Sequence, residues 1–342
     1  MFSSFGFCFS IYFNALSSTR FIPKVSLYLH CLHRHVICKP GAGYHPPMFS
    51  YRHAFHAGNH ADVLKHLTLI AAIEHLMHKE PGIQFVDTHA GAGLYRLDGD
   101  YAAKSGEAAE GYLKLRELTL DKPLPALQNY LDMVASFNAK GSHKIYPGSP
   151  FIIHKLLRHE ARDRLKLFEL HPTDHKSLSG NIEQLAAGRT VSVARADGFE
   201  SLKALLPPPA SSSGSRRTCV LIDPSYEMKN DYFRVLDCIQ DSLKRFATGT
   251  YIVWYPIVPR PEAHDLPRKL KILSGQVKKP WLHATLAIGR ATGGADTGLS
   301  ASGMFLINPP FSLKPLLNEA LPVIEKALGR GPGQGWTVES GG

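Results

Sequence analysis

Short apolar runs, each ending at or beside an acidic residue, recur through the middle of the chain. Four to eight residues is the usual length of a strand that is buried on both faces. The predicted strands are 83–86, 165–170, 191–196, 219–222 and 249–255. Amphipathic segments at 178–187, 199–206 and 231–246 follow the second, third and fourth strands and predict helices. This alternation of strand and helix predicts a parallel, doubly wound α/β sheet.

Two regions depart from the alternation. Helix formers dominate after the first strand, with amphipathic segments at 107–118 and 124–138, so a helical insertion is predicted over about 95–146. Nearer the end, strand-like runs at 283–289 and 304–308 are separated by a glycine-rich segment rather than by a helix. We expect these two runs to form a terminal antiparallel pair at the end of the sheet.

A further helix is predicted to begin after Asn59, a suitable N-cap, and to reach about Lys79. The histidines His56 and His60 near its start raise the possibility of a metal site. No acid or further ligand follows at the spacing of metalloenzymes, so we predict no metal here. We interpret these histidines as polar groups at a ligand site or as ordinary surface residues.

Composition divides the chain into three parts. Residues 1–47 contain no Asp or Glu and hold three of the five cysteines, so we interpret them as an atypical N-terminal extension, unstructured or a start-site artefact. The apolar stretch 5–16 within them is too short to span a bilayer. We expect a single catalytic domain over 48–328 and a flexible tail over 329–342.

The charge balance favours an anionic partner. The formal net charge is +10, from 39 Lys and Arg against 29 Asp and Glu. The extension holds four of the basic residues, so the remainder keeps 35 against 29, or +6. This surplus agrees with binding to nucleic acid, although basic proteins that bind none are common. The two remaining cysteines, Cys219 and Cys238, form no CxxC pair, and the chain is expected in a reducing, cytoplasmic compartment without a membrane partner.

The segment 87–93, with the sequence DTHAGAG, joins the first strand to the insertion. Glycines such as Gly91 and Gly93 let a ligand approach the backbone closely, although a plain turn after a core strand would look the same. A nicotinamide site would need a third glycine and an acid about 20 residues later, and both are missing. S-adenosylmethionine (SAM) carries no phosphate and fits better. Asp87, Glu169 and Asp197, at three successive strand ends, would line one edge of the sheet for it.

Two segments compete for the methyl-acceptor site. Asp223-Pro224-Ser225-Tyr226 differs at one position from the (D/N)PP(Y/F) signature of amino-group methyltransferases, and 308–311 (NPPF) matches it fully. Asp223 ends a parallel strand, on the same edge as the cofactor acids. Asn308 ends an antiparallel strand and would point to the opposite edge, so we predict that Asp223 is catalytic.

The expected chemistry is methylation of an exocyclic adenine nitrogen. The N6 lone pair is delocalised into the ring, so the nitrogen is a poor nucleophile. The Asp223 carboxylate and the Pro224 carbonyl can accept both N6 hydrogens and favour a tetrahedral nitrogen for in-line transfer. Tyr226 would offer a stacking face to the flipped base, worth roughly 1–3 kcal/mol. Ser225 removes no catalytic atom.

From Met48 to about Leu328 the sequence resembles the ribosomal RNA large subunit methyltransferase J family, the bacterial 23S rRNA adenine-N6 methyltransferases. The blocks that carry this resemblance are 51–66, 87–93, 146–150, 169–172, 196–199 and 246–251. The chain departs from the family pattern at Ser225, in the extension and in the Pro- and Ser-rich loop 207–217.

The resemblance implies a Rossmann-like class I SAM-dependent methyltransferase sheet with a helical insertion after the first strand. It implies that Asp223 is the catalytic acid–base residue and that Tyr51 touches substrate RNA. SAM contacts are implied at His66, His89, Ser149, Glu169, Asp197 and Gly198, with Lys65 nearby. The substrate would be one adenosine of 23S rRNA, expected at nucleotide position 2030, and the enzyme a monomer. A DNA adenine methyltransferase, or a non-catalytic RNA-binding protein on the same scaffold, remain the alternatives.

Overall fold

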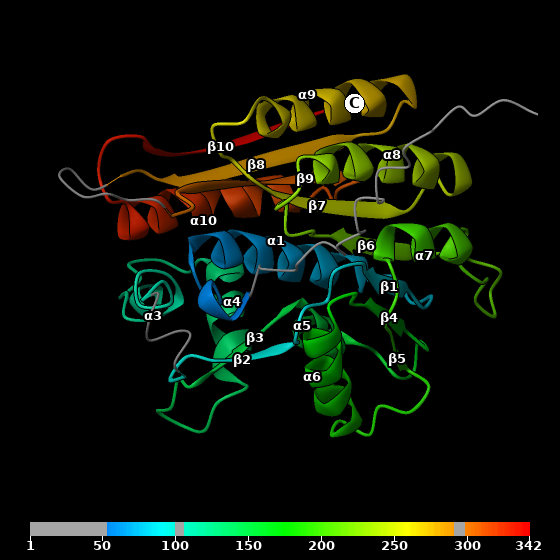
Figure 1. The fold of residues 1–342 in the computed structure, drawn as a ribbon, viewed down its shortest axis with the longest axis horizontal. Coiled ribbons are helices and arrows are strands. Elements are labelled where there is room, and N and C mark those ends of the chain that lie inside the picture. Colours follow the sequence, from blue (N-terminus) through cyan, green and yellow to red (C-terminus); the bar gives the residue numbers. More distant parts are fainter. Residues whose placement is uncertain (1–52, 100–105, 291–297) are drawn as a thin grey trace, which may run out of the picture. The chain divides into compact units, whose positions relative to one another are not determined.

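Five of the eight strands in the central sheet form a parallel block in the computed structural model, which describes residues 53–99, 106–290 and 298–342 (Figure 1). The strand order is β10-β8-β9-β7-β6-β1-β4-β5. The parallel strands are β1 (Gln84–Asp87), β4 (Arg164–Phe168), β5 (Val191–Ala194), β6 (Thr218–Ile222) and β7 (Thr250–Pro256). The predicted doubly wound sheet is therefore confirmed, and the carboxyl ends of these strands share one edge.

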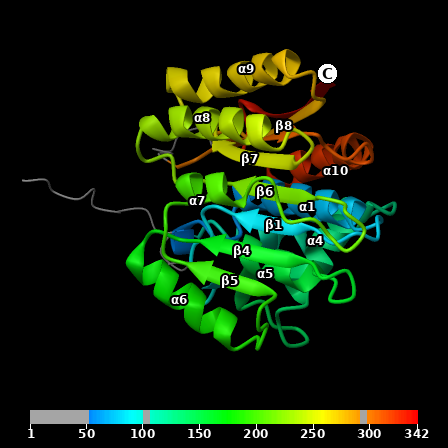
Figure 2. The same ribbon diagram turned by 90° about the vertical axis from the view of Figure 1, so that its right-hand side faces the viewer.

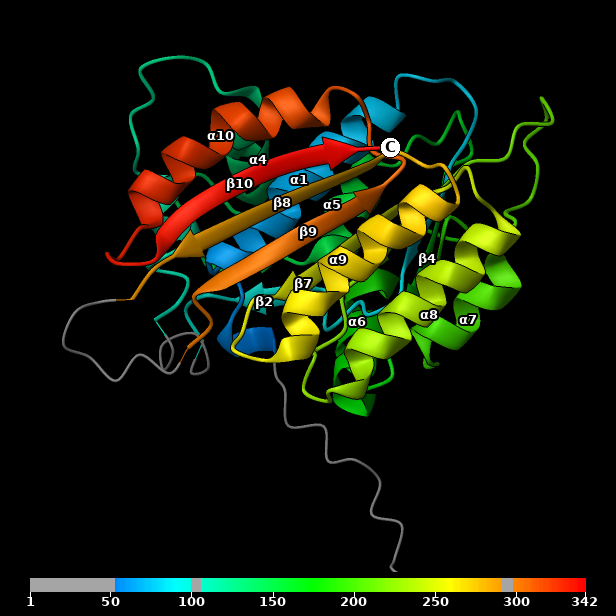
Figure 3. The same cartoon turned by 90° about the horizontal axis from the view of Figure 1, so that it is seen from above.

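Helices cover both faces of the sheet (Figures 2 and 3). On one face α1 (His60–Leu76) contacts α5 (Ser149–Leu156) and α10 (Leu313–Leu328). On the other, α8 (Asn230–Arg245) packs between α7 (Gly198–Leu205) and α9 (Pro261–Gln276). The helix α6 (Pro172–Glu183) connects β4 to β5. Apolar side chains at helical spacing, such as Val235, Ile239 and Leu243 of α8, are buried and fix these faces.

In the described part of the predicted insertion after β1, the helices are α3 (Tyr112–Leu115) and α4 (Pro125–Ala135), which are shorter than the predicted segments. Its two ends form an antiparallel strand pair that was not predicted, β2 (Leu94–Arg96) with β3 (Ile145–Pro147). Three-residue strands are too short to show an alternating pattern, which explains the omission. The pair closes the base of the insertion and returns the chain to α5.

The antiparallel part of the sheet is larger than predicted. The expected pair is present as β8 (Trp281–Ile288) and β9 (Ala301–Ile307). The prediction of a flexible tail over 329–342 is wrong, because β10 (Gln334–Gly341) pairs antiparallel with β8 along its whole length (Figure 3). Glycine and proline dominate the start of this segment and hid the short alternation in which Trp336 and Val338 pack against the core.

The helices α9 and α10 were not predicted. Each contains an internal proline, Pro267 in α9 and Pro322 in α10. An internal proline disfavours a helix, so the sequence pattern did not predict one in either segment. The predicted helix after Asn59 is confirmed as α1, with the Asn59 side chain accepting hydrogen bonds from the backbone nitrogens of Ala61 and Asp62.

Topology separates the two acceptor motifs as predicted. Asn308 follows β9 and donates from Nδ2 to the carbonyl oxygens of Ala247 and Gly249, at the beginning of β7. Asp223 follows β6, at the carboxyl edge of the parallel strands. The NPPF segment therefore lies at the opposite edge of the sheet from Asp223. The extension 1–47 and Tyr51 lie outside the described residues.

Candidate active site

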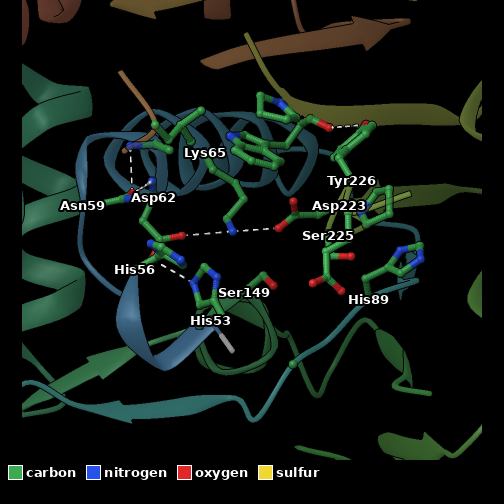
Figure 4. Close-up of a pocket in the computed structure, with 18 of the residues that line it drawn as sticks. His53, His56, Asn59, Asp62, Lys65, His89, Ser149, Asp223, Ser225 and Tyr226 are labelled. Carbon is green, nitrogen blue, oxygen red and sulfur yellow. Dashed lines mark hydrogen bonds and ion pairs between the residues drawn. The ribbon is translucent and has the colours of Figure 1, made fainter. Parts of the chain in front are cut away.

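A cavity of about 550 Å³ opens at the carboxyl edge of the parallel strands (Figure 4). Its walls come from the first half of α1 and from the loops that follow β1, β4, β6 and β7. The predicted site residues that line it are Lys65, His66, His89, Gly91, Ser149, Glu169, Asp223, Pro224 and Tyr226. The structure thus brings the predicted cofactor residues and the predicted acceptor loop to one cavity.

Lys65, on helix α1, forms an ion pair with Asp223 in the loop after β6. Its ammonium nitrogen Nζ lies 2.7 Å from Asp223 Oδ2 and 3.0 Å from Asp62 Oδ1, one helical turn earlier (Figure 4). Asp62 Oδ2 in turn lies 3.0 Å from His53 Nε2 and accepts a hydrogen bond from the Gly58 backbone. Asp62 was not predicted as a site residue, although its i,i+3 spacing to Lys65 was visible in the sequence.

These contacts set the charges at the centre of the cavity. Burial raises the pKa of Asp223 above its ordinary value, and the neighbouring Lys65 ammonium opposes that rise. Burial also acts to raise the pKa of Asp62, but the charges of His53 and Lys65 hold it well below the ordinary value. Asp62 is therefore the permanent anion that keeps the Lys65 ammonium in place beside Asp223.

Behind the part of the cavity wall that Ser149 and His89 form, Asp87 is fully buried and does not line the cavity itself. Its carboxylate accepts a 2.6 Å hydrogen bond from Ser149 Oγ and a longer one from the His89 backbone nitrogen. Burial lowers the pKa of His89 to about 3, so its imidazole is neutral. Asp87 therefore positions two lining residues rather than facing a ligand.

Glu169 lines the cavity with a carboxylate that is already oriented by the backbone. Oε2 accepts from the Gly91 nitrogen and Oε1 from the His171 nitrogen, both at 2.7 Å. Gly91 has a φ of +60°, a conformation that favours glycine and directs its N–H at Glu169. Gly93, with a φ of +81°, does not line the cavity and is packed against Phe151.

Asp197 and Gly198 also lie outside the cavity lining. Asp197 Oδ1 caps α7 by accepting from the backbone nitrogens of Phe199 and Glu200, and Oδ2 accepts a 2.5 Å bond from Arg234. A side chain at Gly198 would collide with the Thr88 carbonyl oxygen, 2.0 Å from its Cβ position. The glycine therefore allows the loops after β1 and β5 to touch. Arg234 lies on α8, and no local pattern pointed to it.

On the acceptor side, Tyr226 is only 3% exposed although it lines the cavity. Its hydroxyl donates to the Trp254 carbonyl oxygen at 2.7 Å, and its ring lies 4.6 Å from that of Tyr232. Arg260 donates to the Tyr226 carbonyl oxygen. The tyrosine ring is therefore held rigidly at the cavity wall. Trp254, Tyr232 and Arg260 line the cavity too, and sequence patterns did not identify them.

The histidines near α1 have defined partners. His56 Nδ1 lies 3.0 Å from both carboxylate oxygens of Glu107 in the insertion. His66 Nδ1 contacts the Tyr146 hydroxyl at 2.9 Å, and its other nitrogen, Nε2, is buried with no partner in the described ranges. Within those ranges no group of three or more His, Cys, Asp or Glu is placed to hold a metal ion. No helix in them is long and apolar enough to cross a bilayer.

Comparison with known proteins identifies relatives over most of the chain. The family model described as ribosomal RNA large subunit methyltransferase D, RlmJ, matches residues 80–340. Ribosomal RNA large subunit methyltransferase J of Escherichia coli is 43% identical over 282 residues, which cover 82% of this chain and 94% of that protein. The protein of the same name from Haemophilus influenzae is 42% identical, over 85% of this chain and 98% of its own length.

A solved structure shares the fold. The crystal structure of protein LPL1258 from Legionella pneumophila superimposes with a TM-score of 0.70 at 31% sequence identity. The match covers 84% of this chain and 98% of that one. The two chains therefore share their overall fold.

Proposed function

Because this chain belongs to the ribosomal RNA large subunit methyltransferase family RlmJ, we propose that it transfers a methyl group from SAM to the N6 atom of an adenosine in 23S rRNA. One observation carries this proposal. Asp223 lies in the same cavity as Gly91, Ser149 and Glu169, so a donor held by those residues would meet an acceptor held by Asp223.

The cofactor wall fits SAM. Glu169 presents an oriented carboxylate, which suits a ribose diol, and His66 offers a buried ring nitrogen without a partner in the described chain. When bound, SAM would supply the methyl group as an alkylsulfonium. His89 and Ser149 would contact it from the segments that Asp87 positions. Asp197 and Gly198 would contact it from the loop after β5, which packs against the loop after β1.

The acceptor loop fits an exocyclic amine. Lys65 binds Asp223 through Oδ2, which leaves Oδ1 to accept an N–H from the substrate. The Pro224 carbonyl would accept the second N–H, so that the N6 lone pair is directed away from the ring. After transfer the nitrogen would carry a positive charge, and Asp223 would take its proton. Tyr226 would contact the base at the wall where Trp254 and Tyr232 hold its ring.

The adenosine must be unpaired or flipped to reach this cavity, because N6 is inaccessible in a stacked helix. Tyr51, which precedes the described residues, remains a candidate RNA contact. Arg158 is not a candidate phosphate contact, since its guanidinium is bound to Asp163 and to the Met77 and Lys79 carbonyls. We expect the chain to act as a monomer on 23S rRNA, without a metal.

The test is transfer of labelled methyl from SAM to protein-free 23S rRNA and, in parallel, to duplex DNA. We expect N6-methyladenosine in the digested rRNA and none in the DNA. Methylation of the DNA alone would favour a DNA enzyme. SAM-independent RNA binding without transfer would favour a non-catalytic role.

The Asp223→Asn variant tests whether Asp223 is the catalytic residue. It should retain SAM binding by calorimetry and lose at least about 100-fold in transfer rate, as expected when a catalytic acceptor is removed. Asp241→Asn is the matched control, because Asp241 pairs with Arg245 on the exposed side of α8. Transfer at the wild-type rate by Asp223→Asn would refute the catalytic role.

A further inference from the structure

A row of buried hydroxyl groups connects the insertion to the cofactor wall. The Tyr130 hydroxyl, on α4, lies 3.1 Å from the Tyr146 hydroxyl, on β3. The Tyr146 hydroxyl lies 2.9 Å from His66 Nδ1, on α1. All three residues have no solvent exposure. The row ends at His66 Nε2, which has no hydrogen-bond partner among the described residues, and His66 lines the cavity.

Counting hydrogens fixes the direction of this row. If Tyr130 donates to Tyr146 and Tyr146 donates to His66 Nδ1, each hydroxyl hydrogen has an acceptor. If His66 instead donates from Nδ1, one of the two hydroxyl hydrogens has no acceptor among the described residues, and the Nε2 lone pair has no donor there. The first direction leaves only the Nε2–H without a described partner, whereas the second leaves both a hydroxyl hydrogen and the Nε2 lone pair. Each unpaired buried group costs about 1–3 kcal/mol, so the first direction is favoured.

We propose that Tyr146 and Tyr130 are positioning residues that hold His66 as the tautomer with its proton on Nε2, where it donates to an oxygen of the bound cofactor. The proposal rests on the assignment of this cavity to SAM. A neutral donor suits the site, because burial lowers the pKa of His66 to about 3. The imidazole is therefore neutral at neutral pH and carries a single N–H.

The arrangement also gives the insertion a role. The strand β3 carries Tyr146 and leads directly into Ser149 at the start of α5, and both residues touch the cofactor wall. Tyr130 comes from α4, the longer helix of the insertion. The insertion between β1 and α5 therefore completes the cofactor wall through hydrogen bonds rather than only enlarging the domain.

The test records the tautomer in cofactor-free protein labelled with ¹⁵N-histidine, using two-bond proton–nitrogen correlations and assigning His66 by comparison with His66→Asn. We expect the wild-type proton on Nε2. Tyr146→Phe should give a mixture of tautomers and weaken SAM binding roughly 2- to 10-fold, with the rate at saturating SAM unchanged. Tyr130→Phe should keep the Nε2 proton, because Tyr146 still donates to Nδ1.

Tyr112→Phe is the control, because Tyr112 packs against both tyrosines while its hydroxyl contacts His143. It should change neither the tautomer nor SAM binding. A wild-type proton on Nδ1, or unchanged SAM affinity in a folded Tyr146→Phe protein, would overturn the proposal. If that variant fails to fold, the wild-type and Tyr130→Phe spectra decide. The tautomer is read without cofactor, so a protein with the expected tautomer that bound no SAM would contradict the proposed function instead.

Discussion

Replacing Asp87 by Asn should remove one defined part of the pH dependence of stability. Asp87 has no solvent exposure, and its carboxylate is held by Ser149 and by the His89 backbone. Burial raises its pKa from 3.8 to about 7, with the hydrogen bond from Ser149 opposing the rise and the charge of Asp223 adding to it. Asn keeps the size of the side chain and an oxygen for Ser149, but it cannot titrate.

The sign follows from proton binding. Between pH 4 and 7 the folded protein holds a proton on Asp87 that the unfolded chain has released, so unfolding becomes easier as the pH rises. With pKa values of about 7 and 3.8, this group contributes roughly 2–3 kcal/mol more to the free energy of unfolding at pH 5 than at pH 8. Groups that do not interact with Asp87 titrate alike in both proteins and cancel in the comparison.

The assay is urea denaturation of wild type and Asp87→Asn at pH 5 and pH 8, read by tryptophan fluorescence. The loss of stability from pH 5 to pH 8 should be roughly 2–3 kcal/mol greater in the wild type than in the variant. Asp265→Asn, on the exposed side of α9, is the control and should behave as wild type. A difference between wild type and Asp87→Asn below about 0.5 kcal/mol, or of opposite sign, would show that Asp87 is ionised in the folded protein.

Two further predictions concern the two edges of the sheet. Lys65→Met removes the cation that opposes the raised pKa of Asp223, so the acid limb of the pH profile of the single-turnover rate should move to higher pH. Lys65→Arg keeps the positive charge and should leave the limb in place. An unmoved limb with a uniformly lower rate would mean that Lys65 acts through binding. Asn308→Ala loses two hydrogen bonds to backbone carbonyls and should lower the free energy of unfolding by about 1–3 kcal/mol. SAM affinity and transfer rate should stay within twofold of wild type. A selective loss of transfer would return the acceptor role to the NPPF segment.

The sequence predicted the parallel sheet and the edge on which the site lies, because both depend on local patterns. Each parallel strand contains a short apolar run, and three acids lie at their ends: Asp87 is the last residue of β1, Asp223 follows β6 directly, and Asp197 lies three residues beyond β5. In a parallel sheet all such ends meet at one edge. No distance between residues had to be known for that inference, and it also separated Asp223 from Asn308.

The contacts that make the cavity a site could not be predicted in the same way. Lys65 and Asp223 are 158 residues apart, and nothing local in either segment specifies a 2.7 Å ion pair. The contacts of Asp87 and Asp197 show the same limit: both acids were located at strand ends from the sequence, but no local pattern indicated that the first is buried behind Ser149 or that the second caps α7 and binds Arg234. A strand-end acid can orient the wall of a site as well as form it.

The same reasoning explains why the site needs so many buried polar groups. Asp62, Lys65 and Asp223 form a chain of charges in which each member is costly to bury alone and stable only beside the next. Removing the middle member leaves two carboxylates facing one cavity. A fixed cation at that point favours the ionised form of Asp223 beside the aromatic rings of Trp254 and Tyr226. Removing the charge of Lys65 should therefore change both the stability of the fold and the rate of methyl transfer.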